Sequence, residues 1–127
     1  MNKDNLNWRL PNKEELIFIN TNLHRNGLAG FTDGHYWSSE ESNVVSAWAQ
    51  YFFKTNQFTR SKLKYGRIRA VCTFHSKDGG DLYYIGEEIT RGFVFDIQDD
   101  MIFICKKQDE SDLMNWYEAI EKLGGKK

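Results

Sequence analysis

The chain has 127 residues, of which 40 % are hydrophobic, 15 % aromatic and 28 % charged, with ten glycines and one proline. This composition excludes a disordered, collagen-like or coiled-coil chain and predicts one globular domain over residues 1–127. Lys and Arg number 17 against 18 Asp and Glu, for a formal net charge of −1 at pH 7. Because no overall field attracts a polyanion, we expect no nucleic-acid partner.

The apolar runs are short. The longest, residues 16–19 and 101–105, fall far below the ~20 residues of a membrane-spanning helix, and the N-terminal residues lack the apolar region of a signal peptide. We therefore expect neither membrane insertion nor secretion through a cleaved signal. Cys72 and Cys105 lie in strand-like runs without a Cys or His at metal-ligand spacing, which favours free thiols over a disulfide or a metal site.

The first half of the chain predicts a helix followed by strands. We expect the helix at residues 11–23, because Pro11 suits a first helical turn and the pair Glu14 and Glu15 suits the positive end of the helix dipole. Its apolar positions repeat on one face: Leu16, Ile19 and Leu23. A glycine-rich loop at 26–34 then leads to a short aromatic strand at 36–40.

The β signal strengthens after residue 43. Residues 44–54, 56–63 and 65–74 predict three strands of one antiparallel meander, with a turn at Thr55 and Asn56. In the third strand alternate residues point inward: Ile68, Ala70, Cys72 and Phe74.

Residues 75–81 have linker composition and separate the meander from the second half. Residues 92–97 and 101–106 then predict a hairpin around the polar turn 98–100. A second helix follows, capped by Asp109 or Ser111 and stopped by Gly124 and Gly125. Its apolar face repeats at helical spacing: Leu113, Trp116, Ile120 and Leu123.

The chain resembles the Lcl C-terminal domain family in four successive segments: WRLPNKEEL at 8–16, YWSSEE at 36–41, AW at 47–48 and RIRAV at 67–71. That family has a C-type lectin-like fold and occurs in bacterial surface, adhesin-like and phage-associated proteins. The resemblance implies an α+β domain with two helices packed on one twisted antiparallel sheet. It also implies a location at the cell surface or on a phage particle, although the chain shows no export signal.

The segments after residue 81 resemble the opening of the same family's domain: IGE at 85–87, GFVFDI at 92–97 and WYEA at 116–119. Since these elements come first in the family and last here, the resemblance implies a circular permutation. Residues 5–74 form the closing half, 75–81 a bridge and 82–127 the opening half. An extended bridge of this length spans about 23 Å, enough for closure within one chain. A piece of a tandem array, or halves exchanged between two subunits, are the alternatives, so we expect a monomer or a domain-swapped dimer.

Catalytic constellations are sparse. His24, His35 and His75 have no motif around them, and Ser38 and Ser39 lack the glycine frame of a nucleophile elbow. Calcium-dependent lectin-like domains use a Glu-Pro-Asn or Gln-Pro-Asp loop, which the sequence lacks. We expect no enzymatic activity, no cofactor and no metal.

Two further sets of residues fit structural roles. The tryptophans fall in the family-like motifs and are expected in the core: Trp8, Trp37, Trp48 and Trp116. The arginines of the motifs are expected to pair with acidic residues near helix ends and turns: Arg9, Arg67 and Arg69.

The meander from residue 48 to 67 is the best candidate for a binding face, since lectin-like folds bind through their loops and adjacent strands. Its aromatic, amide and basic side chains suit recognition of protein or glycan surfaces: Tyr51, Asn56, Gln57, Arg60, Lys62, Lys64 and Tyr65. We therefore expect a non-catalytic recognition module of bacterial surface or phage adhesion type that binds protein or carbohydrate without calcium. A structural protein that oligomerises, by exchange of halves, and a merely solvated strand face are the alternatives.

Overall fold

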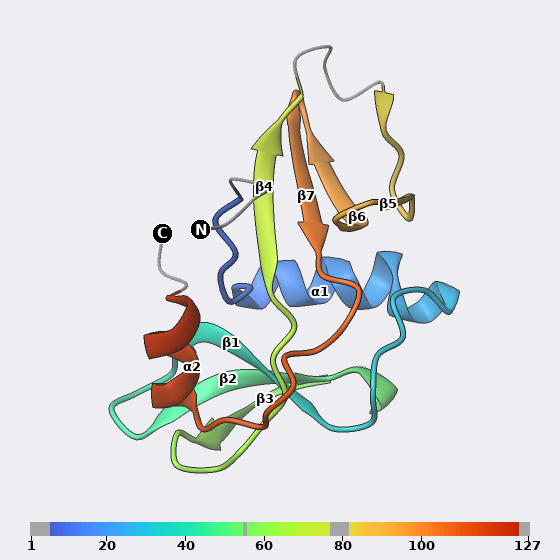
Figure 1. Ribbon diagram of the computed structural model, residues 1–127. Helices are drawn as coiled ribbons and strands as arrows, with labels where there is room; N and C mark the ends of the chain where they lie inside the picture. The colour runs from blue at the N-terminus through green and yellow to red at the C-terminus, as the bar shows by residue number, and fades with distance from the viewer. Residues whose placement is uncertain (1–5, 55, 77–81, 125–127) are drawn as a thin grey trace.

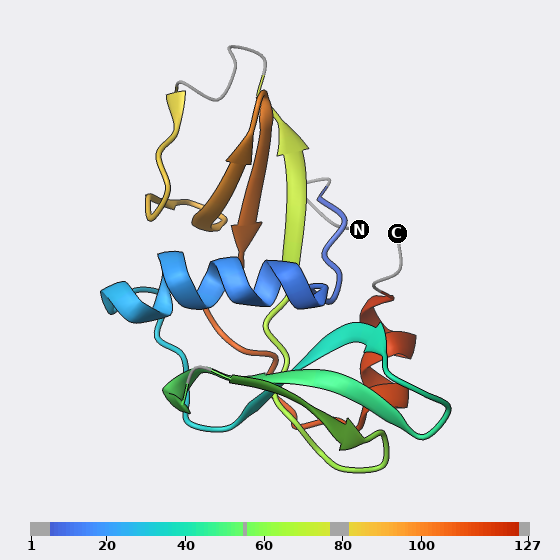
Figure 2. The same cartoon turned by 180° about the vertical axis from the view of Figure 1, so that it is seen from behind.

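The computed structural model describes residues 6–54, 56–76 and 82–124, and has an α+β fold with two helices and two antiparallel sheets. The first helix, α1 (Lys13–Asn22), lies between the two sheets (Figure 1). The second helix, α2 (Trp116–Leu123), lies beside the smaller sheet, as the reverse view also shows (Figure 2). No helix in the described ranges is long and apolar enough to cross a membrane.

The smaller sheet has the order β1-β2-β3, with β1 at His35–Glu41, β2 at Ser46–Tyr51 and β3 at Asn56–Ser61. The larger sheet has the order β4-β7-β6-β5, with β4 at Val71–His75, β5 at Glu88–Ile89, β6 at Gly92–Gln98 and β7 at Met101–Cys105. Short 3-10 turns follow α1 at His24–Asn26 and β2 at Phe52–Lys54. The expectation of one sheet that carries both helices is therefore wrong.

The start of α1 is fixed by side chains close to it in sequence. The Asn12 carboxamide oxygen accepts a hydrogen bond from the Glu15 N–H at 2.8 Å, and the Glu15 carboxylate accepts from the Asn12 N–H at 2.9 Å. This reciprocal cap satisfies two backbone donors and places the helix start at Lys13 rather than Pro11. The predicted apolar face is confirmed, since Leu16 is buried together with Ile19 and Leu23.

The second helix is shorter than the sequence suggested. Its N-cap is Asn115, and neither Asp109 nor Ser111 caps it. Asp109 instead binds other side chains, and just before the helix Met114 and Gly66 exchange backbone hydrogen bonds. Gly124 ends the helix as predicted, whereas Gly125 lies outside the described residues.

The predicted meander is only partly present. β1, β2 and β3 pair in sequence order, but the third predicted strand, residues 65–74, does not pair with β3. Its first part lies along β1, where the Arg67 N–H donates to the His35 carbonyl at 2.7 Å. Its last part, β4, crosses to the other sheet and pairs with β7. The alternation of inward and outward residues at 65–74 indicates a strand, but it does not indicate which other strand pairs with it.

The hairpin of the second half is confirmed. β6 and β7 pair on either side of Asp99 and Asp100, and Asp99 takes the left-handed conformation that a tight turn requires. The larger sheet joins β4, which precedes the expected bridge, to β5–β7, which follow it. Of the expected bridge, residues 77–81 lie outside the described part of the chain, as does Thr55 of the expected turn.

Three apolar clusters hold these layers together. One joins α1 to both sheets, one surrounds Trp37 and Trp116 between the smaller sheet and α2, and one lies on the other face of the larger sheet. Trp37 and Trp116 are buried as predicted, whereas Trp8 and Trp48 are half-buried. Cys72 and Cys105 are buried as thiols, in agreement with the sequence-based expectation.

Candidate functional site

The strand register of the smaller sheet gathers part of the predicted binding residues on one face. Tyr51 lies opposite His35 on one side and Asn56 on the other. Because directly paired residues point to the same face of a sheet, and every second residue of a strand does too, Phe58 and Arg60 share this face. We call His35, Tyr51, Phe58 and Arg60 the aromatic face.

The rings of the aromatic face pack against one another. The His35 and Tyr51 rings are stacked with centroids 5.1 Å apart, and Phe58 meets His35 edge to face at 5.0 Å. All three rings stay half-buried, so each keeps part of its apolar surface in contact with solvent. The stacking fixes the orientation of the side chains, which lowers the entropy lost when a ligand binds.

Arg60 lies at the border between this face and the core. Its guanidinium carbon is 5.5 Å from the centroid of the Trp37 ring, and its Nη1 donates to the Tyr65 carbonyl at 3.0 Å. No carboxylate in the described part of the chain forms an ion pair with it. The guanidinium therefore retains donors and a positive charge for an external acceptor.

Partial burial and nearby charged groups keep the side chains of His35 and Tyr51 neutral at physiological pH. Partial burial lowers the pKa of His35, and the positive charge of Arg60 lowers it further, against a smaller opposite effect of Asp33. A hydrogen bond to the Asp33 carboxylate raises the pKa of the Tyr51 hydroxyl. His35 and Tyr51 consequently present uncharged aromatic surface at pH 7.

Other predicted residues lie elsewhere. Gln57 points to the opposite face of the sheet, where its amide nitrogen donates to the Lys13 carbonyl of α1 at 2.8 Å. Lys62 is only 2 % exposed, because its ammonium group pairs with Glu41 and donates to a backbone carbonyl. Lys64 and Tyr65 are exposed in the turn after β3. The structure thus brings together Tyr51, Asn56 and Arg60 from the predicted set.

His35 and Phe58 were not predicted as site residues. His35 precedes the strand expected at 36–40, whereas it begins β1 in the structure, and its place beside Tyr51 depends on the register between β1 and β2. Phe58 could have been found from sequence, since it lies two residues from both Asn56 and Arg60 and therefore shares their face of β3.

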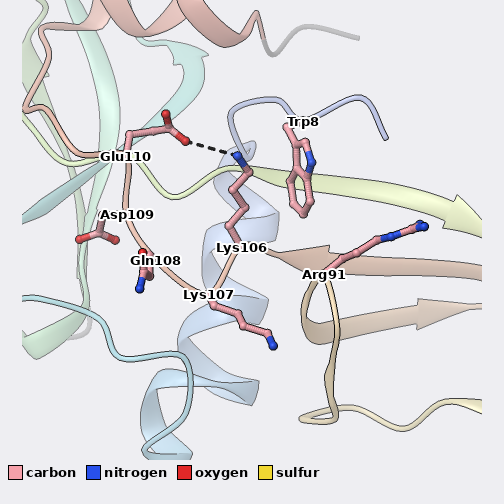
Figure 3. Close-up of a pocket in the computed structure, with 7 residues that line it drawn as sticks. All are labelled: Trp8, Arg91, Lys106, Lys107, Gln108, Asp109 and Glu110. Carbon is pink, nitrogen blue, oxygen red and sulfur yellow. Dashed lines mark ion pairs between the residues drawn. The ribbon is translucent and has the colours of Figure 1, made fainter. Parts of the chain in front are cut away.

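Apart from the aromatic face, a groove of about 640 Å³ lies beside Trp8 and the segment that follows β7 (Figure 3). Its lining residues are Trp8, Arg91, Lys106, Lys107, Gln108, Asp109 and Glu110. Lys106 extends between Trp8 and Glu110, with its Nζ 5.1 Å from the Trp8 ring centroid and 3.8 Å from a Glu110 carboxylate oxygen. Asp109 pairs with Arg69 and Lys107 with Glu88, so most charges of this groove are neutralised within the protein.

The ion pairs expected for the motif arginines are largely present. Arg9 binds both carboxylate oxygens of Glu15 at 2.7 Å, and Arg69 pairs with Asp109. Arg67 differs, because its Nε donates to the backbone carbonyl of Asp33 at 3.3 Å. In the ranges that the structure describes, no group of three His, Cys, Asp or Glu side chains is placed to hold a metal ion.

Comparisons of the chain with family models, with curated protein sequences and with solved structures gave no match.

Proposed function

We propose that the chain is a non-catalytic recognition module that binds protein or carbohydrate without calcium through its aromatic face. The observation that carries this proposal is the packed trio His35, Tyr51 and Phe58, half-exposed beside an arginine without a carboxylate partner. Aromatic side chains combined with arginine and amide groups are typical of recognition surfaces. Such a face offers apolar area and directional donors at a low entropic cost.

The Lcl-like, C-type lectin-like fold and the circular permutation belong to the same proposal. They are supported by the larger sheet, in which β4 of the closing half pairs with β7 of the opening half. This pairing agrees with two halves that complete one domain. A role in adhesion at a bacterial surface or on a phage particle follows from the resemblance, and the aromatic face is where the ligand would bind.

Glycan binding can be tested with the intact protein on a glycan array in the presence of EDTA, followed by ¹⁵N NMR titration with an oligosaccharide that binds on the array. We expect binding that survives EDTA, with shifts at His35 and Tyr51. Tyr51→Ala and Phe58→Ala should weaken it about tenfold or more. Phe53→Ala is the matched control, because Phe53 is exposed and packs on His24 outside the face. Shifts confined to the groove of Figure 3, or equal losses with Phe53→Ala, would contradict the proposal.

Assembly by exchanged halves remains the second candidate. The observation that favours it is the β4–β7 pairing, which runs from Val71 and Cys105 to His75 and Met101 and is the contact that an exchange would transfer to a second chain. Light scattering over a concentration series measures the solution mass. A monomer supports the closed recognition module, whereas a dimer whose β4 pairs with the β7 of a second chain would make assembly the function.

A further inference from the structure

Cations without a carboxylate partner gather around the aromatic face. Lys54 and Arg60 form no ion pair within the described ranges. Six other lysine and arginine side chains of the described residues are paired with carboxylates: Arg9, Lys62, Arg69, Lys106, Lys107 and Lys122. Lys54 and Arg60 therefore keep positive charge available to an external carboxylate, with the Asp33 carboxylate beside Tyr51 as an opposing charge.

Distances and charge effects link both cations to rings of the aromatic face. The Lys54 ammonium is 5.9 Å from the Tyr51 ring centroid, and the charge of Arg60 acts on His35. Arg67 does not belong to this set, because it pairs with Tyr36 of β1 and therefore shares the opposite face of the sheet. An acidic partner that reaches the rings would meet the positive charges of Lys54 and Arg60.

The strand that carries Arg60 is also an open edge. β3 pairs with β2 and forms the outer strand of its sheet (Figure 2). In the part of the chain that the structure describes, the Lys64 N–H donates to the outward Ser61 carbonyl at 3.0 Å, and no other backbone hydrogen bond reaches the outer side of β3. Its outward N–H and C=O groups can therefore pair with an added strand.

We infer that β3 binds an acidic, extended peptide of a protein partner as an additional strand of the smaller sheet. The inference rests on the proposed recognition function and names its partner. On the aromatic face the added strand lies beside Asn56, Phe58 and Arg60, which follow one another at every second residue. The peptide that fits has an apolar residue opposite Phe58 and, two residues away, an acidic residue opposite Arg60.

A peptide fits this site better than a polyanionic polymer. The His35 ring is stacked on Tyr51 and contacted by Phe58, so few ring faces are open for stacked bases. The Asp33 carboxylate beside Tyr51 repels a continuous chain of negative charges. Only a polypeptide supplies the main-chain donors and acceptors that the β3 edge leaves open.

The test uses ¹⁵N NMR titration of the full chain with a blocked peptide of two Val-Thr-Glu-Thr repeats, which alternates apolar and acidic residues on one face. We expect shifts at residues 56–61 and binding that weakens with salt. A Val-Thr-Lys-Thr peptide should not bind. Alternate backbone N–H groups of the added strand point toward β3 and away from it, which divides the peptide nitrogens into two sets. Methylating the set that faces β3 should abolish binding, whereas methylating the other set should not.

Variants locate the contact on the protein. Arg60→Gln should weaken peptide binding about tenfold, whereas Arg91→Gln, which removes an arginine that also lacks an ion pair but is more exposed and lies at the other sheet, should have no effect. The inference would be overturned if dextran sulfate or oligothymidylate bound as tightly as the peptide. It would also be overturned if neither set of methylated positions weakened peptide binding. Oligosaccharide binding at the aromatic face without peptide binding would overturn it and leave the proposed function standing, whereas shifts at neither surface would remove both.

Discussion

The Arg69 guanidinium lies 2.9 Å from the Asp109 carboxylate, and this ion pair joins the two strand-to-strand crossings of the fold. Arg69 precedes β4 on the crossing out of the smaller sheet, and Asp109 follows β7 on the return. Arg69 is 1 % exposed and also donates to the Ala29 carbonyl at 2.7 Å. The other Asp109 oxygen accepts from the Tyr36 hydroxyl at 2.8 Å. One network thus connects both crossings to β1.

Removing either partner of this pair should therefore destabilise the whole domain. Arg69→Met leaves Asp109 without its cation, and Asp109→Asn leaves a buried guanidinium uncompensated. Each should lower the free energy of unfolding by about 3 to 5 kcal/mol in urea titrations. The double variant should lose less than the sum, because the two side chains act as one unit.

The ion pair between the exposed Lys122 side chain and Glu110 is the control for this experiment. Lys122→Gln should change the free energy of unfolding by less than about 1 kcal/mol. Similar losses for Lys122→Gln and Arg69→Met would show that the buried network has no special role.

Because of Tyr36, the free energy of unfolding should fall at alkaline pH. Burial, opposed by a hydrogen bond from the Thr32 N–H and assisted by Asp109, raises the pKa of the Tyr36 hydroxyl to about 12. Since the neutral form is favoured in the folded state, this contribution is complete below pH 10 and is lost as the pH rises from about 10 to about 12. The loss should be on the order of 2 kcal/mol. Urea titrations at several pH values should show this slope in the wild type and a shallower one in Tyr36→Phe.

The Glu15 carboxylate has two roles, since it caps α1 and binds Arg9 in a two-pronged contact. Glu15→Ala should therefore cost about 2 to 3 kcal/mol of stability. Glu14→Ala, one residue earlier on the exposed side of the same turn, should cost less than about 0.5 kcal/mol. Circular dichroism during chemical unfolding measures both values, and equal costs would contradict the buried placement of Glu15.

Local signals in the sequence predicted both helices and the β6–β7 hairpin because each depends on residues close together in the chain. Leu16 and Ile19 mark the buried face of α1 at helical spacing, and Asp99 lies in the turn of the hairpin. The cap of α2 was missed because several residues there can cap a helix. Asp109 is one of them, but Arg69 binds its carboxylate, a contact across the fold that spacing does not reveal.

The candidate site was predicted only in part, because the local sequence locates its strands but not the contacts between them. Tyr51 and Arg60 belong to strands that the sequence located, but their common neighbour His35 comes from β1 through a register that no local pattern fixes. Lys62 was expected at the surface as a basic residue. It is buried because Glu41, from another strand, supplies its counter-charge.

Both cysteines should resist modification in the folded protein. Burial raises the pKa of the Cys105 thiol to about 11, against smaller opposite effects from Arg69 and nearby backbone groups, and Cys72 is equally enclosed. Ellman's reagent at pH 8 should label neither thiol in native protein and both in concentrated urea. Rapid labelling in buffer would show that the larger sheet opens.

At Gly92 the backbone of β6 lies against the Cys105 carbonyl of β7, and a side chain there should separate the two strands. A Cβ atom at this position would overlap the Cys105 carbonyl oxygen, which is backbone and cannot rotate away. Gly92→Ala should therefore cost about 3 kcal/mol or more. Gly27→Ala is the matched control, since Gly27 has a φ of 72° but no atom within 4 Å of the added Cβ. It should cost only about 1 kcal/mol, from backbone strain. Urea unfolding of the two variants compares these costs, and a Gly92→Ala protein as stable as Gly27→Ala would require a wider spacing between β6 and β7.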